Sequence, residues 1–172
     1  AQQQGLSFNR RFHMKDGTVR FNPGWLNPDI VRPAGPVDPD LGMVFFQEAH
    51  SREIFASLVN FALHLDNTEG TLYAADYPYF LERTLRAQFG PSFTLLFGTG
   101  TCGDINHYDV TTKEIRQSET IGATLGRTVA AGLPQAKAMS RPRLAVRRGV
   151  VEVPLQRYTP AEIEQAKKDM DK

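Results

Sequence analysis

Two apolar runs with polar ends constrain this 172-residue chain more than any other feature. The first run, LVNFAL, ends at His64, and the second, FTLLF, ends in the glycine-rich turn GTGTCGDINH. Apolar runs of this length predict buried strands. Many enzymes present reactive side chains on a rigid edge where such strands end. We therefore expect one site edge, with His64 at one strand end and Asp104–His107 at the other.

The rest of the pattern predicts an α/β (or α+β) fold, with a mixed β-sheet core flanked by helices and forming part of a larger catalytic domain. Strands are expected in two antiparallel hairpins and one buried run: Met43–Phe46 with Ile54–Leu63, Leu144–Val146 with Val150–Leu155, and Phe93–Phe97. Helices are expected at about Tyr77–Phe89, at about Ser118–Ala131, and from Thr159-Pro160 to the end of the sequence.

Three details of these helices can be read from the residues. Asp76 is placed to cap the first helix. Gly122 and Gly126 would let another backbone approach the second helix closely. Thr159 and Glu162 have the spacing of a capping box at the start of the third helix.

The segment 6–40 carries five prolines, with Phe12 and Trp25 among the aromatic residues interleaved with them. The prolines argue against helix and central strand, and the aromatic residues favour an ordered wrapping segment over a disordered linker. We treat 1–172 as a single partial domain. The sequence starts with polar residues and no methionine, and its last helix has no capping signal. We therefore expect a piece of a longer polypeptide.

Composition excludes several classes of function. The formal net charge of +1 gives no electrostatic case for nucleic acid or a membrane surface as the main partner. The longest apolar runs are too short for a transmembrane segment. A single cysteine, Cys102, excludes an intramolecular disulfide and says little about compartment.

Several side chains near the strand ends have chemistry to offer. His64 is a candidate zinc ligand, with Asp66 two residues on, or a histidine that is merely hydrogen-bonded at a strand end. Cys102 is a candidate nucleophile with His107 as its base, or a small buried apolar group. Arg10 could stabilise an oxyanion or form a surface salt bridge.

Three blocks of this sequence resemble, in order and approximate spacing, the neutral (non-lysosomal) ceramidase N-terminal domain family. The blocks are SFNRR with Asn9-Arg10, NFALH followed by AADYPYFLE, and Phe97 with the turn GDINH. The resemblance runs from about residue 6 to 172. It implies that His64 ligates a catalytic zinc and that Arg10 contacts the reacting group. It also implies an amide substrate of the N-acylsphingosine kind and a secreted or periplasmic location.

Two departures from the family pattern limit what the resemblance implies. Asn106 stands where the family has its active-site serine, and an amide cannot act as a hydroxyl nucleophile, although it can donate to an oxyanion. The family's other zinc ligands have no clear match. Either they lie outside this chain, in the rest of the polypeptide or a partner subunit, or the metal site is absent.

Two functions of different classes follow from these residues. The first is a ceramidase-like, zinc-dependent hydrolase of a small-molecule or lipid amide or ester, with Arg10, Asp104 and Asn106 as catalytic residues and Asp76 and His107 in the pocket. The second is a non-catalytic binding or structural module that keeps the same fold.

Overall fold

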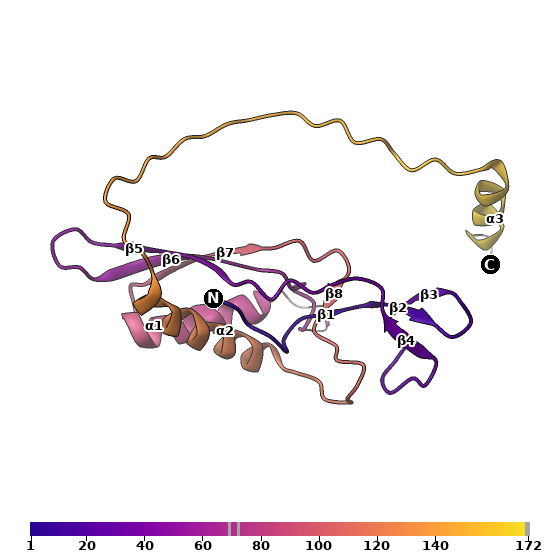
Figure 1. Ribbon diagram of the computed structural model, residues 1–172, viewed down its shortest axis with the longest axis horizontal. Helices are drawn as coiled ribbons and strands as arrows, with labels where there is room; N and C mark the ends of the chain where they lie inside the picture. The colour runs from indigo at the N-terminus through magenta and orange to yellow at the C-terminus, as the bar shows by residue number, and fades with distance from the viewer. Residues whose placement is uncertain (69, 72, 171–172) are drawn as a thin grey trace. The chain divides into compact units, whose positions relative to one another are not determined.

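The computed structural model describes residues 1–68, 70–71 and 73–170, and it divides into two compact units, 1–137 and 138–172. Among the described residues, no helix has the length and apolar character needed to cross a membrane. Figure 1 shows the order of the elements along the chain.

The main sheet of the first unit has three strands in the order β5 (Gly42–Gln47), β6 (Ile54–Phe61) and β7 (Thr94–Thr99). β5 and β6 pair antiparallel, which confirms the predicted hairpin, while β6 and β7 pair parallel. The sheet is therefore mixed, and the chain belongs to the α/β class. The strand expected at 93–97 begins one residue later and continues to Thr99.

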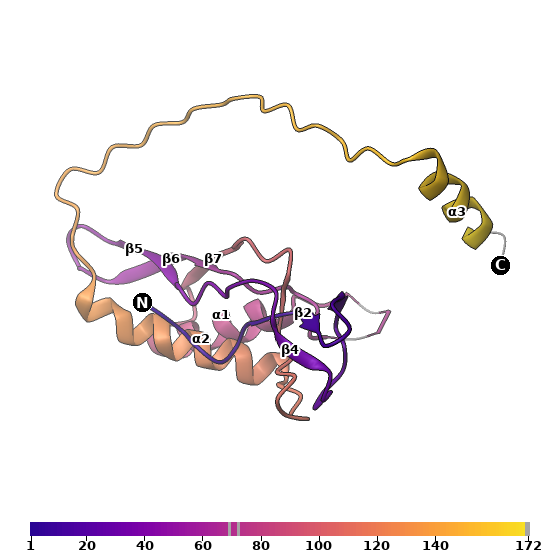
Figure 2. The ribbon, with the colours of Figure 1, turned by 45° about the vertical axis from the view of Figure 1, so that its right-hand side comes forward.

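Two helices, α1 (Asp76–Phe89) and α2 (Ser118–Gly132), cover one face of this sheet (Figures 1 and 2). A short 3-10 helix, η1 (Leu133–Gln135), follows α2. A β-carbon on Gly122 would lie 2.3 Å from the carbonyl oxygen of Tyr77, and one on Gly126 would lie 2.7 Å from the Thr84 side chain. These glycines allow the close approach of α1 and α2, as predicted. Side chains that are essentially unexposed fill the space between sheet and helices: Val59, Phe61, Leu63, Tyr77, Leu81, Leu85, Phe93, Ile121, Leu125 and Val129.

The proline-rich segment folds into a small antiparallel sheet in the order β3 (Val19–Phe21), β2 (Arg11–Met14) and β4 (Ile30–Pro33). The expectation that prolines preclude a central strand was wrong for β2, which contains no proline and pairs on both sides. Pro33 ends the edge strand β4, where a missing N–H is tolerated. A short strand β1 (Phe8–Asn9) pairs with β8 (Ile105–Asn106) and joins this segment to the glycine-rich turn.

The second unit contains one helix, α3 (Pro160–Met170), preceded by chain without regular structure. The hairpin predicted at 144–155 was wrong, because the structure assigns no strand there. All residues of 138–170 are exposed, so an alternating apolar pattern has no surface to bury against. The predicted capping box is confirmed. The Thr159 backbone N–H donates to the Glu162 carboxylate at 2.7 Å, and the Glu162 N–H donates back to the Thr159 hydroxyl at 3.3 Å.

Candidate functional site

The parallel pairing of β6 and β7 brings the ends of both strands to one edge of the sheet, because Phe61 lies opposite Thr99. His64 and Cys102 each follow three residues after these positions. Their side chains meet there, with His64 Nδ1 2.9 Å from Cys102 Sγ. The histidine beside Cys102 is therefore His64, and not His107 as its closeness in sequence suggested.

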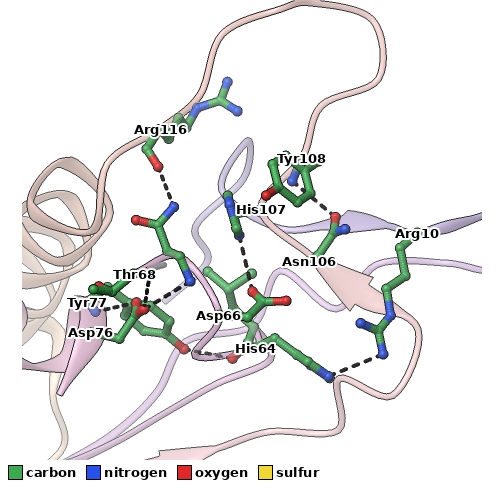
Figure 3. A network of polar contacts seen from close by, with 12 residues as sticks. Arg10, His64, Asp66, Thr68, Asp76, Tyr77, Asn106, His107, Tyr108 and Arg116 are labelled. Atoms are coloured by element: carbon green, nitrogen blue, oxygen red, sulfur yellow. Dashed lines mark hydrogen bonds and ion pairs between the residues drawn. The ribbon is translucent and has the colours of Figure 1, made fainter. Parts of the chain in front are cut away.

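Arg10 joins this edge from the junction of β1 and β2. Its backbone N–H donates to the Asp104 carbonyl at 2.7 Å, and its Nη2 donates to the Gly103 carbonyl at 2.9 Å. The same Nη2 lies 3.3 Å from His64 Nε2, so residues 54 positions apart are in contact (Figure 3). Its guanidinium also lies 4.7 Å above the centre of the Phe21 ring, in a cation–π contact.

The contact with Arg10 fixes which nitrogen of His64 carries the proton. A guanidinium only donates hydrogen bonds, so His64 Nε2 accepts and the proton of the neutral ring lies on Nδ1, facing Cys102. Burial raises the pKa of the Cys102 thiol, Arg10 opposes that rise and Asp66 adds to it. Cys102 is therefore a neutral thiol near pH 7, a poor state for a nucleophile.

Asp104 also contacts this segment, and its carboxylate accepts a hydrogen bond from another side chain of the protein. Its Oδ2 accepts a 2.7 Å hydrogen bond from Nδ2 of Asn9, which is itself 2% exposed. A β-carbon on Gly35 would lie 2.9 Å from that nitrogen, so the neighbouring loop packs tightly over the pair. This arrangement holds the backbone of Arg10. From sequence, Asn9 was named only as part of the SFNRR block, and no role was predicted for it.

Asn106 is 1% exposed, and both groups of its amide have partners. Its Nδ2 donates to Asn22 Oδ1 at 2.9 Å, and its Oδ1 accepts from the Tyr108 backbone N–H at 3.1 Å. The side chain thus ties the glycine-rich turn to the loop after β3. One N–H of the amide is left over from these two bonds.

His107 is also buried, at 2% exposure, and its Nδ1 lies 3.2 Å from Asp66 Oδ1. Asp66 is therefore directed at His107, and Figure 3 shows its carboxylate between the rings of His64 and His107. His64 and Asp66 are not arranged as a pair of ligands. The Asp66 carboxylate is directed at His107, whereas the His64 ring is directed at Arg10 and Cys102. His107 lines a cavity together with Thr68 and Ser118.

Asp76 anchors the loop that follows His64. Its Oδ2 accepts from the backbone N–H groups of Asn67 at 2.9 Å and Thr68 at 2.6 Å, and its Oδ1 accepts from Tyr77 N–H at 2.6 Å. Asp76 itself has a φ of 53°, a strained value for a residue with a side chain. The prediction that Asp76 caps this helix was wrong: Asp76 is the first residue of α1, Ala75 stands at the cap position without a side-chain hydrogen bond, and the Asp76 carboxylate mainly serves the loop.

Tyr77, at the start of α1, forms a hydrogen bond with the backbone next to His64. Its hydroxyl donates to the Leu63 carbonyl at 2.8 Å, directly before the histidine. Burial, and the nearby negative charge of Asp76, raise the pKa of this phenol, so it stays a donor. The start of α1 thereby fixes the backbone that presents His64.

The described residues do not by themselves complete a zinc site. A catalytic zinc takes about three protein ligands and an open position. Within the described ranges, no three histidine, cysteine, aspartate or glutamate side chains are grouped to hold a metal. His64 also has both ring nitrogens engaged, one by a thiol and one by the cationic Arg10.

Comparison with known proteins gives a structural match and no sequence match. No model of a known protein family matches the chain, and no curated protein does. A structure described as ceramidase complexed with C2 matches at 15% identity and a TM-score of 0.56, over 78% of this chain and 21% of that one. Neutral ceramidase from Pseudomonas aeruginosa matches over the same shares, at 15% identity and a TM-score of 0.50.

The chain therefore spans about a fifth of the length of the structures it matches. The similarity covers most of this chain, and the motif resemblance in the sequence pointed to the same proteins. At this identity the comparison speaks to the fold. The protein has a ceramidase-like α/β fold that corresponds to one part of a larger structure.

Proposed function

We propose that this protein is a ceramidase-like hydrolase of an amide or ester bond, and that residues 1–137 form one edge of its active site. One observation carries the proposal: Arg10 Nη2 lies 3.3 Å from His64 Nε2 at the edge where two parallel strands end. Both residues come from the blocks that resemble the ceramidase family. Their meeting in space is independent of that resemblance, because they are far apart in sequence.

In this proposal Arg10 stabilises the negative charge that develops on the carbonyl oxygen of the substrate. Its backbone is fixed by Asp104, and its Nη2 by the Gly103 carbonyl, so the cation is held before the substrate arrives. Its Nε is buried, has no hydrogen-bond partner among the described residues, and is a donor still available at the site. A preorganised cation of this kind contributes most where water is excluded.

His64 has two parts in the proposal. In the described residues it accepts from Arg10 and so steadies the guanidinium. We also assign it one ligand position of a zinc ion whose other ligands would belong to residues outside 1–172; for this, Nε2 would exchange its contact with Arg10 for the metal. Zinc in such a hydrolase would supply an activated water.

The experiment compares Arg10→Ala with Arg11→Ala, since Arg11 is the adjacent, exposed arginine. Hydrolysis of a panel of acyl amides and esters is measured with the complete protein. We expect Arg10→Ala to lower kcat/KM by roughly 10²–10³, the usual effect of removing one oxyanion donor. Arg11→Ala should leave it unchanged. Equal losses in the two variants would overturn the role of Arg10.

His64→Ala is compared with His50→Ala, because the His50 side chain is 97% exposed. Bound metal is measured by elemental analysis alongside hydrolysis. The proposal expects loss of zinc and of activity in His64→Ala only. Unchanged metal content in that variant would remove His64 from the ligand set.

A second candidate function has its own observation. Asn106 occupies the position of the family's serine, and its amide is used to join Asn22 and Tyr108. A fold kept for binding or structure, with the nucleophile lost, accounts for this arrangement. Absence of hydrolysis over the whole substrate panel, with retained ligand binding, would select this function over the first.

A further inference from the structure

A small pocket lies beside the candidate site, on the far side of Asn106. It has a volume of about 160 Å³ and is lined by Asn22, Gly24, Trp25, Tyr108 and Val110. Its link to the site is direct, because Asn106 Nδ2 donates to Asn22 Oδ1 at 2.9 Å. Asn22 also follows Phe21, the ring on which Arg10 lies.

The walls of the pocket are aromatic. The rings of Trp25 and Tyr108 meet edge to face, with centroids 5.6 Å apart and an interplanar angle of 76°. Two rings at this angle form a corner that offers one ring face and one ring edge. A third aromatic ring placed in such a corner gains favourable contacts with both. Trp25 is 41% exposed, so this apolar wall is open to solvent.

The loop that builds the pocket is held in an unfavourable backbone conformation. Asn22 and Leu26 have φ values of 44° and 54°, which residues with side chains rarely adopt. Hydrogen bonds hold it there, from Asn22 N–H to the Arg10 carbonyl at 2.8 Å and from Leu26 N–H to the Val110 carbonyl at 2.7 Å. Strain of this kind is concentrated at ligand sites, where the surrounding structure maintains it.

The volume of the pocket and the absence of charge in its lining limit which ligands it can bind. Engineered cavities of about 150 Å³ take a single benzene-sized group, whereas drug-sized ligands need about 300 Å³ or more. None of the five lining residues carries a formal charge. The pocket therefore suits one neutral ring.

We propose that this pocket binds an aromatic ring of a neutral substrate, with the reacting carbonyl directed toward Arg10. The role in catalysis rests on the proposed hydrolase function, whereas binding of the ring does not. The sequence presented Trp25 only as part of a wrapping segment. Its ring contact with Tyr108 and its place in the pocket beside Asn22 make it a determinant of specificity.

The test uses Trp25, the single tryptophan of residues 1–172, as its reporter, and Trp25→Phe measured in parallel identifies its share of the fluorescence. Benzamide is titrated into the complete protein while tryptophan fluorescence is recorded, with acetamide and cyclohexanecarboxamide as comparison probes. We expect a saturable change with benzamide, a much weaker one with cyclohexanecarboxamide and none with acetamide. No saturable change with benzamide, or equal affinity for the cyclohexyl probe, would overturn the proposal.

Val110→Phe fills the pocket and leaves Trp25 in place. It should abolish the response to benzamide, while Val150→Phe, at a valine that is 89% exposed, should not affect it. Nuclear Overhauser contacts from benzamide to the Trp25 indole and the Val110 methyls test the same pocket in the wild-type protein, should Val110→Phe not fold. Because neither readout needs turnover, loss of hydrolysis and loss of ring binding remain separate results.

Discussion

Two segments of this chain have similar strand-like patterns and opposite outcomes. The segment 43–63 forms the β5–β6 hairpin, and in β6 Val59 and Phe61 are fully buried. The segment 144–155 forms no strand, and there Leu144 is 96% and Val151 82% exposed. The two segments have similar apolar residues, and what differs is whether other parts of the protein pack against them. An alternating pattern becomes a strand only where another surface, here α1 and α2, covers it.

The difference between the two segments has an energetic basis. Fully burying one valine, leucine or phenylalanine side chain contributes about 1.5–3 kcal/mol, whereas ordering one residue costs about 1–2 kcal/mol. Residues of β6 would gain the free energy of burial, which offsets the cost of ordering them. Residues of 144–155 would incur only the cost of ordering. Substitutions should therefore have large effects in the first unit and small effects in the second.

The largest effect is expected for Gly122→Leu at the contact between α1 and α2. A β-carbon there would lie 2.3 Å from a backbone oxygen, so the helices must separate. We expect a loss of about 3 kcal/mol or more in the free energy of unfolding, or no soluble protein. Chemical denaturation measures it. Gly149→Leu is the matched control, since nothing lies within 4 Å of that position, and a comparable loss there would contradict the contrast.

A smaller effect is expected for a pair of leucines. Leu85→Ala removes a fully buried side chain and should cost about 2–5 kcal/mol. Leu144→Ala removes one that is 96% exposed and should stay within about 0.5 kcal/mol. Thermal and urea unfolding of the two variants compare them directly. Similar losses would mean that 144–155 is packed in solution.

Thr159→Ala should have an effect that is confined to the second unit. The hydroxyl accepts from the Glu162 N–H at 3.3 Å, and loss of a helix cap costs about 1 kcal/mol. We expect fewer helical chemical shifts in 160–170 and no change in the unfolding of residues 1–137. A lowered midpoint for the first unit would show that α3 is coupled to it.

The smallest effect is a dependence of α3 on pH. Hydrogen bonds from Thr159 lower the pKa of Glu162 below its ordinary value of 4.5. The stabilisation is therefore complete above that value and is lost as pH falls through the lowered pKa. Helical shifts of 160–170 should decrease in acid, and Glu162→Gln should reduce that decrease. A pH titration followed by NMR that gives the same curve for both proteins would exclude Glu162 as the cause.

Local pattern was enough to predict the elements that bury an apolar face. β6, α1, β7 and α2 followed from hydrophobic periodicity and capping residues, and the close α1–α2 contact followed from Gly122 and Gly126. The prolines of 6–40 misled, because their steric effect acts on their own positions and on the preceding residue, and β2 ends at Met14, well before the first of them at Pro23.

The sequence predicted which residues lie at the candidate site, but it did not predict which side chains contact one another there. His64 and the glycine-rich turn were placed at one edge from sequence, and the parallel pairing of β6 and β7 brings them there. The partners came from tertiary structure: Arg10 for His64, Asn9 for Asp104 and Asn22 for Asn106. Each of these pairs joins residues more than fifty positions apart, beyond the reach of any local rule.

The single thiol of this chain makes the candidate edge chemically addressable. Cys102 is the only cysteine in the sequence, and its sulfur lies 2.9 Å from His64. Because burial raises its pKa, alkylation should be slow at neutral pH and faster in alkaline solution. A spin label or fluorophore attached there would report directly on whatever occupies the space beside Arg10 and His64, and within residues 1–172 no other cysteine competes for it.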